Sequence, residues 1–163
     1  MAKEQSFDVV SQADRNEVHN AVNLAQKELA TRYDFKKSVS AITLEGDDLV
    51  LVSDNDGKLK SVVDVLEDKL VRRQVPLKAL QYGKVESALG GTVRQRVRVN
   101  QGIDDEKARA ISKTVRQEFK KVKVSVQGDT LRVFSPKKDE LQAVMALLRE
   151  HDFGIPLQFT NYR

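Results

Sequence analysis

This chain contains an internal repeat, so any fold proposed for it has to accommodate two copies of one unit. Residues 32–36 (Arg-Tyr-Asp-Phe-Lys) match residues 116–120 (Arg-Gln-Glu-Phe-Lys) at an offset of 84 residues. Further matches lie downstream: residues 42–47 with 124–129, Pro76-Leu77 with Pro156-Leu157, and Tyr82 with Tyr162. A match that extends over this many segments indicates a tandem duplication of one structural unit.

Apolar residues recur at helical spacing in four segments, two in each half of the chain. In the first segment a stripe of five apolar residues follows Asp14, which is placed to cap the helix. In the last segment Ser135-Pro136 combines a cap residue with a first-turn proline. We expect the four helices around residues 14–31, 59–70, 104–119 and 136–148.

Extended segments surround these helices. Gly46-Asp47-Asp48 and Gly128-Asp129 each separate two short apolar runs, which is typical of a hairpin. Each half also has a leading and a closing extended segment: residues 7–10 and 75–80 in the first, and 93–99 and 156–162 in the second. The order βαββαβ therefore occurs twice. This order predicts an α+β fold, a tandem duplication of a ferredoxin-like sandwich with antiparallel sheets, in which each sheet leaves one face open.

Composition excludes several classes of function. With 40% hydrophobic and 32% charged residues, the chain is expected to fold throughout. It has no cysteine, which excludes disulfides, thiolate metal sites and thiol catalysis. No apolar stretch approaches the roughly 20 residues that span a bilayer, so we expect a cytoplasmic protein that does not contact the membrane.

Charge is divided unevenly between the two halves. Residues 1–82 carry 12 basic and 14 acidic side chains, whereas residues 83–163 carry 16 basic and 10 acidic side chains. An excess of positive charge in the second half favours an anionic partner there, although scattered surface lysines give the same count in proteins that bind nothing.

The strongest local signal is the run Val93-Arg94-Gln95-Arg96-Val97-Arg98-Val99. In a strand, side chains alternate between the two faces, so Arg94, Arg96 and Arg98 are expected together on the face away from the core. Guanidinium groups match phosphate bidentately, which makes a phosphate group a suitable ligand. The alternative is a solvated face on which neighbouring carboxylates pair with the arginines.

The second hairpin offers a weaker candidate. Leu131 and Val133 are expected to face the core, which leaves Arg132 and Phe134 on the open face. An aromatic ring beside an arginine can stack on a nucleobase. However, the corresponding strand of the first half, residues 49–52, offers only aliphatic side chains. Coverage of Phe134 by the other domain or by another chain is therefore the favoured interpretation.

No catalytic set, metal site or cofactor site is predicted. The segment Ala88-Leu89-Gly90-Gly91-Thr92 lacks the spacing of a phosphate-binding loop, and its two glycines are interpreted as a turn between the domains. His19 and His151 belong to separate surface helices without ligand spacing. The chain is therefore not expected to be an enzyme.

Several segments resemble the YajQ family. They cover essentially the whole chain and include residues 6–11, 30–36, 83–95, 101–103 and 156–163. The resemblance implies a bacterial cytoplasmic protein with two ferredoxin-like domains whose first strands are exchanged, and a role in nucleotide binding. It places one domain at residues 12–90 with the strand 93–100, and the other at residues 101–163 with the strand 6–11. Some relatives are linked to transfer RNA or cyclic dinucleotides.

The leading hypothesis is therefore a non-catalytic nucleotide-binding protein. Its ligand would be a nucleotide or an RNA, such as transfer RNA or a cyclic dinucleotide, bound on a basic open sheet face through Arg94, Arg96 and Arg98. Arg132 and Phe134 are secondary candidates. The alternative is a protein-interaction or regulatory adaptor whose open sheet faces dock a protein partner.

Overall fold

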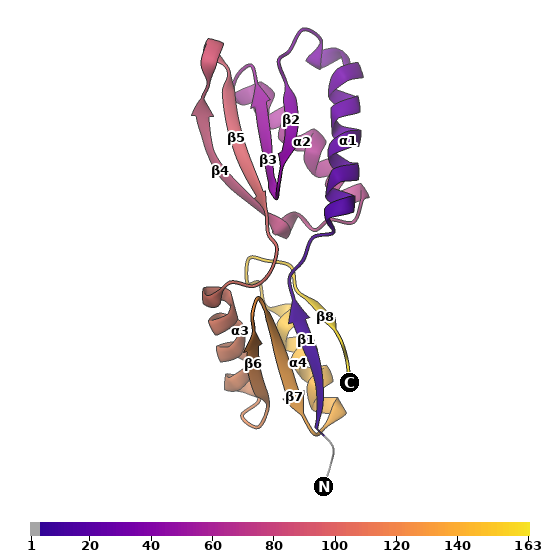
Figure 1. Cartoon of the computed structure of the whole chain (residues 1–163), viewed down its shortest axis with the longest axis vertical. Coiled ribbons are helices and arrows are strands. Elements are labelled where there is room, and N and C mark those ends of the chain that lie inside the picture. Colours follow the sequence, from indigo (N-terminus) through magenta and orange to yellow (C-terminus); the bar gives the residue numbers. More distant parts are fainter. Residues whose placement is uncertain (1–3) are drawn as a thin grey trace. The chain divides into compact units, whose positions relative to one another are not determined.

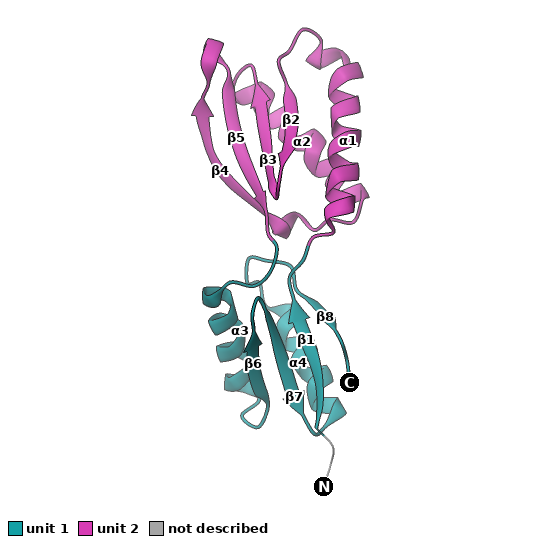
Figure 2. Cartoon of the chain, viewed as in Figure 1, with its two compact units in different colours: residues 1–12, 101–163 teal, residues 13–100 magenta. Residues whose placement is uncertain are grey.

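The computed structural model describes residues 4–163 and divides the chain into two compact units (Figures 1 and 2). Unit 1 contains residues 1–12 and 101–163, and unit 2 contains residues 13–100. Unit 2 is thus one continuous segment, whereas unit 1 is assembled from both ends of the chain. Within residues 4–163, none of the helices is long and apolar enough to cross a bilayer.

Unit 2 contains two helices against one antiparallel sheet of four strands in the order β2-β3-β5-β4. Helices α1 and α2 pack their apolar stripes on one face of this sheet, where residues such as Val22, Leu51 and Leu66 are buried. The elements are α1 (Arg15–Thr31), β2 (Ala41–Glu45), β3 (Asp48–Ser53), α2 (Asp56–Arg72), β4 (Leu80–Ser87) and β5 (Val93–Val99). Three short 3-10 segments lie between them, at Tyr33–Phe35, Leu77–Ala79 and Leu89–Gly91.

Unit 1 repeats this architecture with the strand order β6-β7-β1-β8, also antiparallel. Its core is formed by residues such as Phe7, Ile111, Leu131 and Leu141. The elements are β1 (Gln5–Val10), α3 (Asp105–Glu118), β6 (Lys123–Gln127), β7 (Thr130–Ser135), α4 (Lys138–Glu150) and β8 (Gln158–Thr160). The predicted α+β class with two ferredoxin-like sandwiches is confirmed.

The first strands are exchanged between the two repeats. Strand β1 lies between β7 and β8, so that Phe7 is opposite Val133 and Val9 is opposite Phe159. Strand β5 lies between β3 and β4 in the other sheet. Each exchanged strand buries alternate apolar side chains in the core of the unit that it joins. A strand in the middle of a sheet cannot be removed without exposing that core.

The local signals at the helix starts have different outcomes. Asp14 and Asp104 accept hydrogen bonds from backbone amides of α1 and α3, as predicted. Ser135-Pro136 does not open α4 directly, because this helix begins at Lys138. Ser135 Oγ accepts a hydrogen bond from the Lys137 amide at 3.1 Å and donates one to Glu140. Ser135 therefore shapes the turn before the helix.

Three other expectations need correction. Residues 75–80 are not a strand, because Pro76 leads into the 3-10 segment Leu77–Ala79 and strand β4 begins only at Leu80. The closing strand of unit 1 is limited to Gln158–Thr160. Gly90 and Gly91 do not connect domains; they lie in the connection between β4 and β5, two paired strands of unit 2. The strand exchange explains this last error, because β5 belongs to unit 2 and the chain passes from unit 2 to unit 1 only between residues 100 and 101.

Candidate functional site

The structure brings Arg94, Arg96 and Arg98 together on one side of β5. Val97 and Val99 are buried in the core of unit 2, and the three arginines alternate with these core positions, so they point away from helices α1 and α2. Their side chains are 46%, 51% and 66% exposed. Side chains on one face of a strand are about 7 Å apart along the chain. We call this surface, with its cross-strand neighbours on β2, β3 and β4, the arginine face.

Carboxylates from the neighbouring strands balance these three charges. Arg94 lies 3.4 Å from Glu86 of β4. Arg96 lies 3.5 Å from both Glu45 and Asp48, and Arg98 also lies 3.5 Å from Asp48. These contacts are at the long end of the hydrogen-bonding range and exposed, and such pairs contribute about 0–1 kcal/mol. The pairing leaves each guanidinium with further N–H donors directed to solvent.

Arg132 is held by a partly buried carboxylate on the sheet of unit 1. Its Nε donates to Asp8 Oδ1 at 2.8 Å, its Nη2 donates to Oδ2 at 3.4 Å, and Asn161 adds a bond to Oδ2 at 2.8 Å. The hydrogen bond from Arg132 lowers the pKa of Asp8 below its ordinary value, and burial opposes this shift. The guanidinium of Arg132 therefore links β7 to β1.

Phe134 lies in a hollow at the edge of the same sheet. It is the cross-strand neighbour of Lys123, since β6 pairs with β7. The hollow has a volume of about 470 Å³ and is also lined by Arg116, Lys120 and Ser125. Phe134 is half-buried, so part of its ring remains accessible beside cationic side chains. Arg132 and Phe134 belong to unit 1 and the arginine face belongs to unit 2, so the five predicted site residues are divided between the two units.

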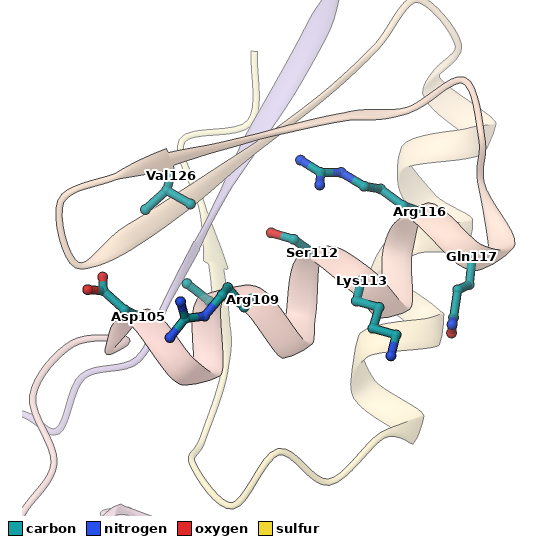
Figure 3. A pocket seen from close by; sticks show the side chains of 8 residues that line it. Asp105, Arg109, Ser112, Lys113, Arg116, Gln117 and Val126 are labelled. Carbon is teal, nitrogen blue, oxygen red and sulfur yellow. The ribbon is translucent and has the colours of Figure 1, made fainter.

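A second basic hollow lies between α3 and the edge strand β6 (Figure 3). We call it the α3 groove; its volume is about 500 Å³. It is lined by Arg109, Lys113 and Arg116, together with Ser112 and Val126. Sequence reasoning missed these cations because it read α3 only for its apolar stripe. Their spacing at i, i+4 and i+7 is the signal that would have placed them on one side of the helix.

Nothing in the described part of the chain forms a metal centre. Within residues 4–163 there is no group of three or more histidine, aspartate, glutamate or cysteine side chains that could hold a metal ion. The arginine face, the hollow at Phe134 and the α3 groove all present guanidinium or ammonium groups, which can bind anions.

Comparison with known sequences decides the family. Residues 5–163 match the family described as nucleotide-binding protein YajQ-like. The chain belongs to this family. A nucleotide-binding protein of Desulfitobacterium hafniense is 54% identical over 163 residues, and the match covers the whole of both chains. Proteins with the same description from Exiguobacterium sp. and Heliobacterium modesticaldum are 50% and 53% identical, with 100% of this chain covered and at least 99% of each relative. This YajQ-like chain is thus similar to bacterial proteins along its entire length.

Proposed function

We propose that this protein binds a nucleotide through the arginine face, with Arg94, Arg96 and Arg98 contacting phosphate. The observation that carries the proposal is the position of three half-exposed guanidinium groups on one face of a single strand. Membership of the YajQ-like family, and the description of its relatives as nucleotide-binding proteins, supports this function. The proposed role is non-catalytic and cytoplasmic.

The carboxylates of the arginine face influence which ligands it favours. Glu45, Asp48 and Glu86 balance the three arginines, so the face offers well-placed donors with little net charge. A ligand that makes few, short contacts, such as a cyclic dinucleotide, gains from directed guanidinium donors. A long polyanion such as transfer RNA gains mainly from net positive charge and counterion release. Both ligands remain part of the proposal, and their different salt dependence separates them.

The test compares two sets of substitutions in the full chain. The variant R94Q/R96Q/R98Q removes the proposed phosphate contacts and keeps polar side chains on the strand. The control K27Q/K60Q/R72Q removes the same charge from exposed positions on helices α1 and α2, which cover the opposite face of the sheet. We expect the first variant to lose at least about tenfold in affinity for a labelled cyclic dinucleotide or for transfer RNA, and the control to lose less than about twofold.

Salt titration then identifies the kind of ligand. The affinity for RNA is expected to fall by about tenfold or more between about 50 and 200 mM salt, because several phosphate contacts release counterions. Binding of a cyclic dinucleotide is expected to weaken less. Equal affinities of wild type and R94Q/R96Q/R98Q for every nucleotide and RNA tested would show that the arginine face is not the binding surface.

A second candidate function is docking of a protein partner, and the hairpin of β4 and β5 favours it. Leu89 at the hairpin end is 96% exposed, and Val85 and Tyr82 on β4 are also exposed. Exposed apolar side chains along one hairpin are typical of a contact with another protein. If partner capture from a cell extract is abolished by Leu89→Ser and unaffected by R94Q/R96Q/R98Q, the adaptor function is favoured.

A further inference from the structure

We infer that the α3 groove of unit 1 is a second nucleotide site, which binds the phosphate of a free nucleotide through Arg109, Lys113 and Arg116. The inference rests on the proposed nucleotide binding, but it concerns a different surface from the arginine face. It follows from unpaired cations, an accessible apolar wall and a comparison of the two repeats.

The cations of the α3 groove lack the carboxylate partners that the arginines of unit 2 have. Every arginine of unit 2 lies within 4.0 Å of a carboxylate. Within residues 4–163, by contrast, Arg109, Lys113 and Arg116 have no carboxylate at this distance. Like charges one and two helical turns apart repel each other, and a bound anion relieves this repulsion.

Arg116 is held so that its guanidinium faces the groove. Its Nη2 donates to the carbonyl oxygen of Val124 on β6 at 3.5 Å, which is a long contact that leaves the other donors available. In Figure 3 the Arg116 guanidinium and the Ser112 hydroxyl point toward the hairpin of β6 and β7. The hydroxyl of Ser112 makes no hydrogen bond to any of the residues that the structure describes. Both groups can therefore donate to a phosphate oxygen.

An apolar wall completes the groove. Val126 of β6 is 53% exposed, although its cross-strand neighbour Leu131 is fully buried. Val126 and Ala108 line the groove together with the cations. Small-molecule sites usually have 300–1,000 Å³ and combine apolar walls with a few polar groups, and the volume of about 500 Å³ falls in this range. A sugar or base can pack on Val126 while the phosphate lies on the arginines.

The other repeat has a neutral amide where unit 1 has a cation. Ile42 and Val124 are matching positions of the repeat and lie on the edge strands β2 and β6. Gln26 Nε2 of α1 donates to the carbonyl oxygen of Ile42 at 2.7 Å, as Arg116 Nη2 of α3 donates to the carbonyl oxygen of Val124 at 3.5 Å. Arg116 therefore takes the place of Gln26, so the space between the helix and the edge strand contains this cation only in unit 1.

The groove also has a direction. Asp105 lies at its end near the start of α3, whereas Lys113 and Arg116 lie toward the end of the helix (Figure 3). A carboxylate repels phosphate but accepts hydrogen bonds from ribose hydroxyls and base amino groups. The phosphate is therefore placed near Arg116, and the ribose or base toward Asp105.

The test is an amide-resolved NMR titration of the full chain with ATP, GTP and inorganic tripolyphosphate. At least one of the nucleotides is expected to shift the signals of residues 105–117 and Val126 in a saturable manner. The variant R109Q/K113Q/R116Q is expected to bind that nucleotide at least about tenfold more weakly. The control K121Q/K137Q/K138Q removes the same charge from exposed positions of unit 1 outside the groove and is expected to change affinity less than about twofold.

Asp105→Asn distinguishes specific nucleotide binding from unspecific attraction of anions to the cations of the groove. It is expected to leave tripolyphosphate binding unchanged or slightly stronger and to weaken nucleotide binding, because only the nucleotide carries groups that donate to Asp105. A groove that binds tripolyphosphate but neither nucleotide would overturn the inference, since it would be a general anion site. Equal loss of affinity in R109Q/K113Q/R116Q and its control would also overturn it.

The outcome separates this inference from the proposed function. If nucleotide shifts map only to β5 and disappear in R94Q/R96Q/R98Q, the arginine face is the site and the α3 groove is not. If neither nucleotide binds in the groove while a cyclic dinucleotide or transfer RNA binds the arginine face, only the groove inference fails. If neither surface binds any of these ligands, both fail.

Discussion

The carboxylate of Asp8 is buried within the sheet of unit 1, with only 6% of the residue exposed. It accepts two hydrogen bonds from Arg132 and one from Asn161, so the charge is compensated by donors from β7 and from the C-terminal segment. Burial of a charged group is unfavourable unless it is paired in this way. Asp8 and Arg132 therefore contribute to the stability of unit 1 before any ligand is considered.

Asp8→Asn is expected to destabilise unit 1 by about 1–2 kcal/mol at pH 7, because hydrogen bonds to a charged acceptor are lost while Arg132 remains partly solvated. The pKa of Asp8 in the folded protein is below its ordinary value of 3.8. The stabilisation is therefore complete above that value and is lost as the pH falls through the lower folded-state pKa. Urea unfolding followed by NMR signals of unit 1 should show the difference from wild type shrinking below about pH 4. A difference that stays constant with pH would contradict this account, and Glu150→Gln serves as the exposed control.

Gly102 occupies a position that no other residue fits. Its φ is +94°, and a Cβ added there would lie 2.6 Å from Asp129 Oδ2 and 2.9 Å from Asp129 Cβ. Gly102→Ala is expected to destabilise unit 1 by at least about 2 kcal/mol, since the backbone conformation and the contact are both unfavourable. Gly128→Ala is the matched control, because its φ of +63° is also positive but its Cβ meets nothing within 4 Å. That control is expected to lose about 1 kcal/mol in the same unfolding measurement.

Among the elements, β4 is irregular where it passes Arg96. Its pairing with β5 shifts between Tyr82 and Val85, and a Cβ on Gly83 would lie 2.9 Å from the carbonyl oxygen of Arg96. Gly83→Ala is expected to push β4 away from β5, lower the melting temperature by a few degrees, and shift the amide signals of both strands. Lys84→Ala at the neighbouring exposed position is expected to leave these signals in place. If Gly83→Ala behaved like Lys84→Ala, the close approach of the strands would not be essential to the arginine face.

The repeat predicted the order of the elements but not where each one ends. The matching segments at residues 32–36 and 116–120 adopt different conformations, because Arg32 ends α1 in an extended conformation while Arg116 lies within α3. What the two copies share is that Phe35 and Phe119 both pack on a core. A repeated apolar residue thus fixes burial, while the helix end depends on local hydrogen bonding.

The candidate site was also predictable only in part: the sequence predicts which side chains share a face of one strand, but not which residues of other elements lie beside them. Alternation along β5 was enough to place Arg94, Arg96 and Arg98 on one face, since this needs only the geometry of a strand. Pairing with carboxylates was an alternative from the sequence, but their identity was not predictable. Asp48 comes beside the arginines only through the pairing of β5 with β3, and Glu45 only through the pairing of β2 with β3. The α3 groove depends on the space between a helix and an edge strand, which spacing along one segment does not reveal.

For the whole molecule, strand exchange changes which charged residues belong to the same folded unit. Cut at residue 82, the two halves differ strongly in net charge, which favoured an anionic partner for the second half. Grouped by unit, residues 13–100 carry 15 basic and 13 acidic side chains, and residues 1–12 with 101–163 carry 13 and 11. The net charge is therefore +2 for each unit. The arrangement of cations on each unit, and not an overall excess on one, is what distinguishes their surfaces.

The exchange also predicts which parts of the chain fold alone. Residues 13–100 contain a complete sheet and core, so this segment is expected to fold by itself. Residues 101–163 are expected to stay unfolded, because they lack β1, which supplies Phe7 and Val9 to the core and separates β7 from β8.

Joining the two segments of unit 1 should restore its fold. The Gly102 amide donates to the Ser11 carbonyl oxygen at 2.6 Å, so the ends left by removing residues 13–100 lie next to each other. A chain in which two glycines replace residues 13–100 is therefore expected to fold, because a short loop closes with little loss of entropy. Dispersed amide signals and slow hydrogen exchange at Phe7 and Val133 would report the restored sheet. Should residues 101–163 fold equally well without residues 1–12, β1 would be an accessory strand, and the exchange would not be what makes the two units depend on one chain.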